Sequence, residues 1–165
     1  YYHYGIPKYP LAKKMFGIYR HHLDYKRAIL FRGFDDEFWV PHSRHTETRR
    51  ADIEACPHLN KLASSDEAGV YAVIADHGKQ IFITGHSEYD RDTLKSEYLR
   101  DKNAGLDIDV PVNNFPNDDD TLEPVVKWRS GANLLYSNWL NYFVYQSTPY
   151  DIATVGSERS LENND

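Results

Sequence analysis

The chain has 165 residues, of which 41% are hydrophobic, so it can fold as one domain with a buried core. Its net charge of -6 argues against a general nucleic-acid binder, and no apolar run is long enough for a membrane span or a signal peptide. A single cysteine excludes an internal disulfide framework and favours the cytoplasm. Because the first residue is Tyr1 and not Met, we expect a processed, cleaved or truncated piece of a longer protein.

The N-terminal region is predicted to begin with the end of a helix. Residues 1–4 resemble a last helical turn, with Gly5 as its C-cap and Pro7 as a stop signal. Apolar and β-branched residues then predict strands at 15–19 and 28–31.

The next segments are dominated by turn and polar residues. We expect loops at 32–36 and 41–46, whereas 51–54 is too short to assign and is ended by Pro57. The clearest strands, 70–75 and 80–84, follow, joined by a hairpin-like turn.

Two helices are predicted in the C-terminal half. The first runs from 92 to 104, capped by Asp90 or Asp92 and ended by Gly105, with Leu94 and Tyr98 on one face.

The second helix is expected at 126–146. Between the two helices, residues 107–120 form a Pro- and Asp-rich segment that is too polar for the core. The second helix has an amphipathic stripe formed by Leu135, Trp139, Tyr142 and Phe143. It is closed by Pro149. We expect one domain over 1–151 and a polar, disordered tail over 152–165.

A His-x-Glu sequence follows the strand at 80–84. His86 is suited to proton transfer, and Glu88 can fix the tautomer of its ring and stabilise the imidazolium. Residues i and i+2 of an extended strand share one face, so both side chains are expected on the same side. A strand-end histidine paired with a glutamate, with no catalytic role, is the equally simple alternative.

Other reactive side chains carry weaker signals. His42 and His45 have an H-x-x-H spacing, but no Cys/His cluster supports zinc, and Ser43 lacks the G-x-S-x-G of a nucleophile elbow. Cys56 precedes a proline and lacks the surroundings of a reactive thiolate. Arg100 could hold a substrate carboxylate, or pair with the glutamate three residues before it on the helix.

Five motifs occur together in the order found in one protein family. They are Gly33-Phe34-Asp35-Asp36, Pro41-His42-Ser43-Arg44-His45-Thr46-Glu47, Gly85-His86-Ser87-Glu88-Tyr89, Glu97-Tyr98-Leu99-Arg100-Asp101 and Asn138-Trp139-Leu140-Asn141-Tyr142-Phe143-Val144-Tyr145-Gln146. From residue 1 to about residue 151, the chain resembles the homoserine O-succinyltransferase (homoserine O-acyltransferase) family. The resemblance implies an α/β, flavodoxin-like fold with three layers, of the class I glutamine-amidotransferase type. This chain would be its C-terminal portion.

The resemblance also implies a reaction in methionine biosynthesis. A cysteine would take an acyl group from succinyl-CoA or acetyl-CoA, and the homoserine hydroxyl would then take it from the thioester. His86 matches the family's acid–base histidine and Glu88 its supporting glutamate. Arg100, Lys14 and Ser43 match positions that contact substrate. No bound cofactor is implied, since acyl-CoA is a co-substrate.

The family's nucleophilic cysteine would lie a few residues before Tyr1, outside this chain. We therefore expect the isolated chain to be inactive without an N-terminal partner polypeptide, and we expect the assembled enzyme to be a homodimer. Three positions depart from the family pattern: Asn114 replaces a usual tyrosine, Asp120 a proline and Gly131 a histidine. Glycine inside the predicted helix costs about 1 kcal/mol relative to alanine.

Several alternatives remain open at the level of sequence. Serine could replace homoserine as acceptor, because one methylene is worth only roughly 1–3 kcal/mol in a pocket. The acyl donor is left undecided, since the residues that set it would lie upstream. A glutamine-amidotransferase-like hydrolase, in which a cysteine hydrolyses glutamine, and a non-catalytic fragment are the other two possibilities.

Overall fold

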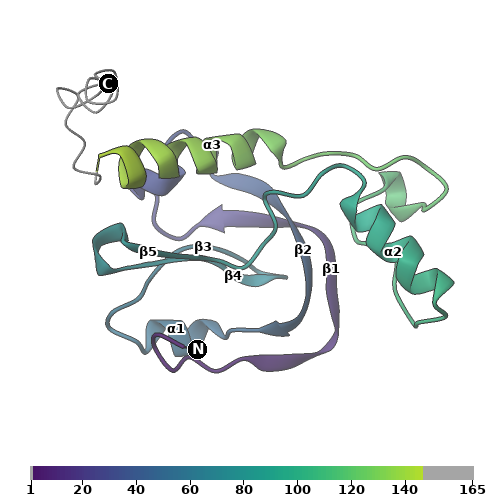
Figure 1. Ribbon diagram of the computed structural model, residues 1–165, viewed down its shortest axis with the longest axis horizontal. Helices are drawn as coiled ribbons and strands as arrows, with labels where there is room; N and C mark the ends of the chain where they lie inside the picture. The colour runs from purple at the N-terminus through teal and green to yellow at the C-terminus, as the bar shows by residue number, and fades with distance from the viewer. Residues whose placement is uncertain (1, 147–165) are drawn as a thin grey trace, which may run out of the picture.

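The structure, a computed structural model, describes residues 2–146. Its centre is a five-stranded sheet with the order β2-β1-β3-β4-β5, in which all neighbouring strands are antiparallel. The strands are β1 (Tyr9–Leu23), β2 (Glu37–Glu47), β3 (Asn60–Ser65), β4 (Gly69–Ala75) and β5 (Gln80–Ile83). Figure 1 shows β1 and β2 curving together, so that the sheet curls around its own strands β3, β4 and β5.

The helices lie around this curled sheet (Figure 1). They are α1 (Arg50–Glu54), α2 (Thr93–Asn103) and α3 (Arg129–Trp139), with short 3-10 turns η1 (Ile29–Phe31), η2 (Asp76–Gly78) and η3 (Pro116–Asp118), and a π-helical segment η4 (Leu140–Tyr145). Helices α3 and α1 lie on opposite sides of the central strands, and α2 projects at the bend of β1 and β2. Within residues 2–146 no helix combines the length and the apolar character needed to cross a bilayer.

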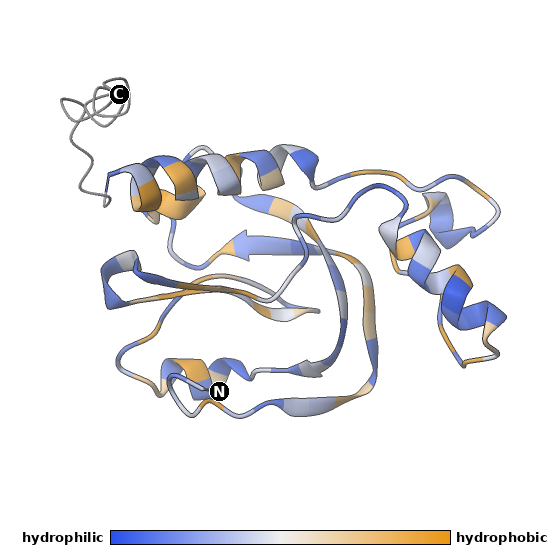
Figure 2. Cartoon of the chain, in the orientation of Figure 1, coloured by the Kyte–Doolittle hydropathy of each residue, from blue (hydrophilic) through white to orange (hydrophobic). Residues whose placement is uncertain are grey.

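The core consists of three apolar clusters. One lies between the sheet and α3 and includes Phe31, Tyr71 and Leu135. A second joins β1 to α2 around Phe16, Leu94, Tyr98 and Trp128, and a third surrounds α1. Figure 2 shows α2 as mostly hydrophilic, so its buried positions Leu94 and Tyr98 are what attach it to the rest of the molecule.

The central hairpin and the first long helix are confirmed. Strands β4 and β5 and helix α2 coincide with the predicted segments 70–75, 80–84 and 92–104 to within one residue at each end. Local patterns sufficed here because each segment is regular and is bounded by turn residues. Gly105, with φ of +73°, follows the C-cap of α2 as expected.

Two predictions in the N-terminal half are wrong. Residues 28–31 form the 3-10 turn η1 rather than a strand, because a short apolar run does not distinguish a strand from a helical turn. Residues 41–46, expected as a polar loop, lie in β2, where His42 pairs with Gly17 and is fully buried. Strand β3 was not predicted. Residues 2–4 form a turn, and Gly5 after them has a φ of +67°.

Further differences concern the C-terminal half. Residues 107–120 do reach the core, since Phe115 is 2% exposed and Val112 forms a bridge with Gly17. The predicted helix 126–146 is α3 followed by the π-helical η4, and of its stripe Leu135 is buried whereas Trp139 is 42% exposed. The predicted closing proline and the tail over 152–165 lie outside the described residues.

Candidate active site

The His-x-Glu segment forms a tight turn directly after β5. His86 Nδ1 lies 2.7 Å from Glu88 Oε1, so the predicted contact between the two side chains is present. The segment is a turn and not an extended strand, which leaves both side chains partly exposed, at 35% and 56%. The other ring nitrogen of His86, Nε2, is therefore the one available for proton transfer.

The backbone around His86 is anchored to neighbouring elements. Its N–H donates to the Pro41 carbonyl of β2 at 2.8 Å, and the Ser87 hydroxyl shares a 2.8 Å hydrogen bond with Tyr71. A Cβ at Gly85 would clash with the Val40 side chain, so only glycine fits at this position. These contacts hold the turn against β2 and β4.

A buried histidine pair lies directly beneath this turn. His21 Nδ1 must donate to the Tyr19 carbonyl at 2.9 Å, so its Nε2 accepts a hydrogen bond from His42 Nε2 at 3.1 Å. His42 Nδ1 is then free to accept from Arg44. Burial lowers the pKa of His21 to about 4 and that of His42 to about 2, so both rings are neutral.

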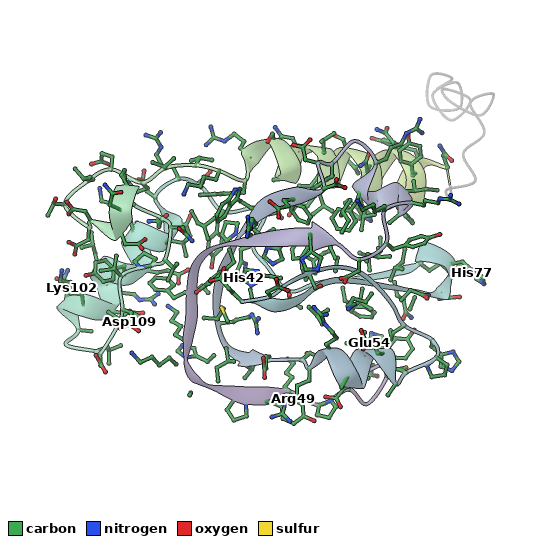
Figure 3. The ribbon with its side chains drawn as sticks, turned by 180° about the vertical axis from the view of Figure 1, so that it is seen from behind. His42, Arg49, Glu54, His77, Lys102 and Asp109 are labelled. Carbon is green, nitrogen blue, oxygen red and sulfur yellow. The ribbon has the colours of Figure 1, made fainter. Side chains whose placement is uncertain are left out.

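The buried histidine pair includes one residue of the weak H-x-x-H zinc motif, His42. His42 is committed to His21 and lies in the middle of the molecule (Figure 3), whereas His45 is exposed. Within residues 2–146 no group of three His, Cys, Asp or Glu side chains could hold a metal ion.

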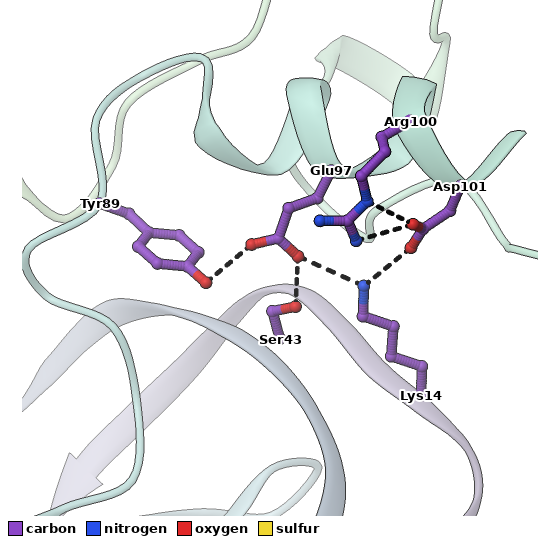
Figure 4. Close-up of polar contacts among 6 residues, drawn as sticks. All are labelled: Lys14, Ser43, Tyr89, Glu97, Arg100 and Asp101. Carbon is purple, nitrogen blue, oxygen red and sulfur yellow. Dashed lines mark hydrogen bonds and ion pairs between the residues drawn. The ribbon is translucent and has the colours of Figure 1, made fainter. Parts of the chain in front are cut away.

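The carboxylate of Glu97 on α2 gathers three donors (Figure 4). Ser43 Oγ donates to it at 2.5 Å, Tyr89 Oη at 2.8 Å and Lys14 Nζ at 3.3 Å. Partial burial opposes its ionisation, but these hydrogen bonds and the Lys14 charge together hold its pKa below the ordinary value. Glu97 is thus an ionised acceptor between β1, β2 and the His86 turn.

Arg100 does not pair with Glu97, the partner expected from helical spacing. Its guanidinium contacts its neighbour Asp101 at 2.7 Å, and Asp101 also receives Lys14 at 3.4 Å. The hydrogen bond from Arg100 lowers the pKa of Asp101, with Lys14 contributing. Arg100 and Lys14 line an open groove of about 740 Å³ between β1 and α2. The arrangement leaves the 67% exposed guanidinium able to meet a small anion.

All five predicted site residues therefore belong to one connected set. His86 and Glu88 form one end, Lys14, Ser43 and Arg100 the other. Three residues link the two ends: Tyr89, Glu97 and Asp101. Sequence reasoning did not assign a site role to these three, although each lies inside a motif that carried the resemblance.

Cys56 has different surroundings from this set of residues. It is partly buried just after α1 and packs against the apolar cluster that contains Ile53 and Val70. Its packing against apolar side chains fits a structural thiol.

The three departures from the family pattern occupy different environments. Asn114 is fully buried, and neither side-chain polar atom has a hydrogen-bond partner. Asp120 accepts hydrogen bonds from Tyr98 and Lys102. Gly131 lies in α3, where a Cβ would come within 3.3 Å of the Phe34 ring.

Comparison with known proteins identifies the family. Residues 1–150 match the family described as HTS, homoserine O-succinyltransferase. The chain belongs to this family. A homoserine O-acetyltransferase of Brevibacillus brevis is 60% identical over 152 residues, which are 92% of this chain and 50% of that protein. One from Clostridium novyi is 61% identical over 151 residues, again 92% of this chain and 50% of that protein.

The chain spans about half the length of the curated relatives it matches. Among solved structures, a glutamine amido transferase of Methylobacillus flagellatus has a TM-score of 0.52 at 12% identity, over 81% of this chain and 55% of that one. The solved structure of SMU.1228c has a TM-score of 0.56 at 17% identity, over 82% of this chain and 55% of that one. These likenesses confirm the expected glutamine-amidotransferase-like α/β fold for this homoserine O-succinyltransferase family member.

Proposed function

We propose that this chain supplies the acid–base pair and the amino-acid pocket of a homoserine O-acyltransferase. The observation that carries the proposal is the single network that joins His86 and Glu88 to Lys14, Ser43 and Arg100 in a member of this family. The cysteine nucleophile would come from the part of the enzyme that this chain does not cover.

The reaction would proceed in two transfers. The cysteine thiolate attacks the acyl-CoA carbonyl, the CoA thiolate leaves, and an acyl thioester forms on the enzyme. The homoserine hydroxyl then attacks this thioester while His86 Nε2 takes its proton, and the cysteine thiolate leaves as the O-acyl ester forms. Glu88 accepts the Nδ1–H of His86 and stabilises the imidazolium that arises.

The pocket side chains would orient the acceptor. Arg100 uses one carboxylate oxygen of Asp101 as its partner, so guanidinium donors remain for the carboxylate of the amino acid. Lys14 and Ser43 both donate to Glu97 Oε2 and would contact the rest of the substrate. Holding the carboxylate fixes the hydroxyl near His86 and so converts an encounter between two molecules into an oriented reaction.

We further propose acetyl-CoA as the donor and homoserine as the acceptor. Curated relatives between 55% and 61% identical are named homoserine O-acetyltransferases, whereas the family as a whole carries the succinyltransferase name. Succinyl-CoA and serine are the competing substrates to be compared in the same assay.

A second candidate function is glutamine hydrolysis, which the likeness to the Methylobacillus glutamine amido transferase favours. The same histidine and a cysteine thiolate would then release ammonia from glutamine instead of transferring an acyl group.

A fusion enzyme tests the proposal. The part of the Brevibacillus brevis relative that the match does not cover is joined to this chain, with the intact relative as positive control. We expect acetyl-CoA and homoserine to give O-acetylhomoserine and free CoA with the fusion, and no turnover with the present chain alone. A folded fusion that releases ammonia from glutamine but acylates neither homoserine nor serine would instead support the second candidate. Full turnover by the isolated chain contradicts the division of the site between two parts.

A further inference from the structure

Tyr89 makes a contact to His86 that the proposed reaction has not used. The two rings lie face to face, with centroids 4.3 Å apart and planes only 13° from parallel. The turn brings them together, since the Tyr89 N–H donates to the His86 carbonyl at 3.3 Å. A single hydrogen bond to Glu88 leaves the imidazole free to tilt about that bond, and a stacked ring removes this freedom.

Tyr89 is itself held at both ends. Its carbonyl accepts a 3.0 Å hydrogen bond from Trp128 Nε1, which is buried against α2. Its hydroxyl donates to Glu97 Oε1 at 2.8 Å, while Glu97 Oε2 receives Ser43 and Lys14. Burial and the bond to Glu97 raise the pKa of Tyr89, so its phenol is neutral and acts as a donor. The Tyr89 ring is therefore a fixed surface for His86.

We propose that Tyr89 is a positioning residue that fixes the plane of the His86 imidazole, and that Glu97, through Tyr89, ties this orientation to the side chains of Lys14 and Ser43. The inference rests on the proposed function, since it assigns His86 Nε2 a direction toward the acceptor hydroxyl. It adds that one carboxylate, that of Glu97, aligns the acid–base group with the residues that would bind the amino acid.

The test compares three variants in this chain and in the fusion. Tyr89→Leu removes the stacked ring, Tyr89→Phe keeps the ring but removes the bond to Glu97, and Tyr98→Phe is the matched control. Tyr98 is a buried residue of α2 and donates a 2.8 Å hydrogen bond to a carboxylate, that of Asp120, but its ring stacks on no imidazole of the described chain.

In this chain the ring-proton NMR signals of His86, assigned through their absence in His86→Gln, report the stacking without any activity. The face of Tyr89 shifts them upfield, so Tyr89→Leu should move them downfield, while Tyr89→Phe and Tyr98→Phe should leave them near the parent values. Unchanged His86 signals in Tyr89→Leu overturn the proposal.

In the fusion we expect kcat to fall about 100-fold for Tyr89→Leu and about 10-fold for Tyr89→Phe, with the KM for homoserine changed less than about twofold. Tyr98→Phe should keep the parent kcat, although it should lose about as much thermal stability as the Tyr89 variants. If Tyr89→Leu keeps a kcat within about twofold of Tyr98→Phe, the positioning role is wrong. If the fusion makes no acylated amino acid with Tyr89 in place, the proposed function fails, and the NMR shift alone decides whether Tyr89 fixes the ring.

Discussion

Glu88 is an exposed side chain to which we assign a proposed role beside His86. Its side chain is 56% exposed, so its attraction for His86 is weakened by water and adds little to the stability of the fold. Its proposed value arises during the reaction, when His86 becomes an imidazolium and a carboxylate 2.7 Å away stabilises that charge.

We therefore predict that Glu88→Gln lowers the kcat of the fusion about 100-fold, with little change in the KM for homoserine or in the melting temperature. Steady-state kinetics with acetyl-CoA would measure this. Glu123→Gln is the matched control, because Glu123 is also an exposed carboxylate and its ion-pair partner among residues 2–146 is Lys95 on α2. Equal losses of kcat in the two variants would show that the effect is one of net charge.

Whether a contact between two side chains can be predicted from the sequence depends on how far apart the two residues are along the chain. His86 and Glu88 are two residues apart, so their contact could be predicted from local geometry. Ser43 and Lys14 meet Glu97 across 54 and 83 residues of chain, which no local pattern encodes. Helical spacing even suggested Glu97 as the partner of Arg100, whereas the guanidinium turns to Asp101 instead.

At the scale of the elements, Gly17 is the position where β1 and segment 107–120 come into close contact. Its φ of +145° is unfavourable for residues with a side chain, and a Cβ there would lie 2.5 Å from backbone atoms of Val112. The neighbouring Ile18 N–H donates to the Val112 carbonyl at 2.8 Å, so this close approach attaches segment 107–120 to β1. That contact is why a polar, Pro-rich segment reaches the core.

Gly17→Ala should lower the free energy of unfolding by about 3 kcal/mol, because backbone strain and an unrelieved clash combine. Gly69→Ala is the control for strain alone, since Gly69 has a φ of +71° with no atom within 4 Å of the added Cβ. It should cost only about 1 kcal/mol. Urea titrations of both variants would measure the difference, and equal costs would rule out the clash as the cause.

At the scale of the whole molecule, the buried pair His21 and His42 links stability to pH. In the unfolded chain each histidine binds a proton below about pH 6.5, whereas in the folded state burial lowers the pKa of His21 to about 4 and that of His42 to about 2. The unfolded state therefore binds more protons in this range, and stability falls as the pH falls. Arg44 and His22 add to the effect, since nearby positive charge disfavours protonation of His21.

We predict that the free energy of unfolding decreases between pH 6.5 and pH 4.5 by up to about 1.4 kcal/mol per pH unit for each of the two histidines. Glu97, Asp101 and Asp120 do not contribute in this window, because their pKa values are lowered and their stabilisation is lost only at more acidic pH. Urea titrations across the pH series would measure the slope. The exposed-histidine variant His45→Gln should keep it, and a constant free energy over the window would contradict the prediction.

The sequence by itself determined the family, the hairpin of β4 and β5, the helix α2 and the His86–Glu88 pair, because each of these depends on neighbouring residues or on motifs read along the chain. Only the tertiary structure decided that 41–46 is a strand and that Tyr89 and Glu97 join the two halves of the site. Polar residues such as His42 enter the core when a partner on a paired strand satisfies them, and that partner, His21 on β1, is in place only when the two strands have paired.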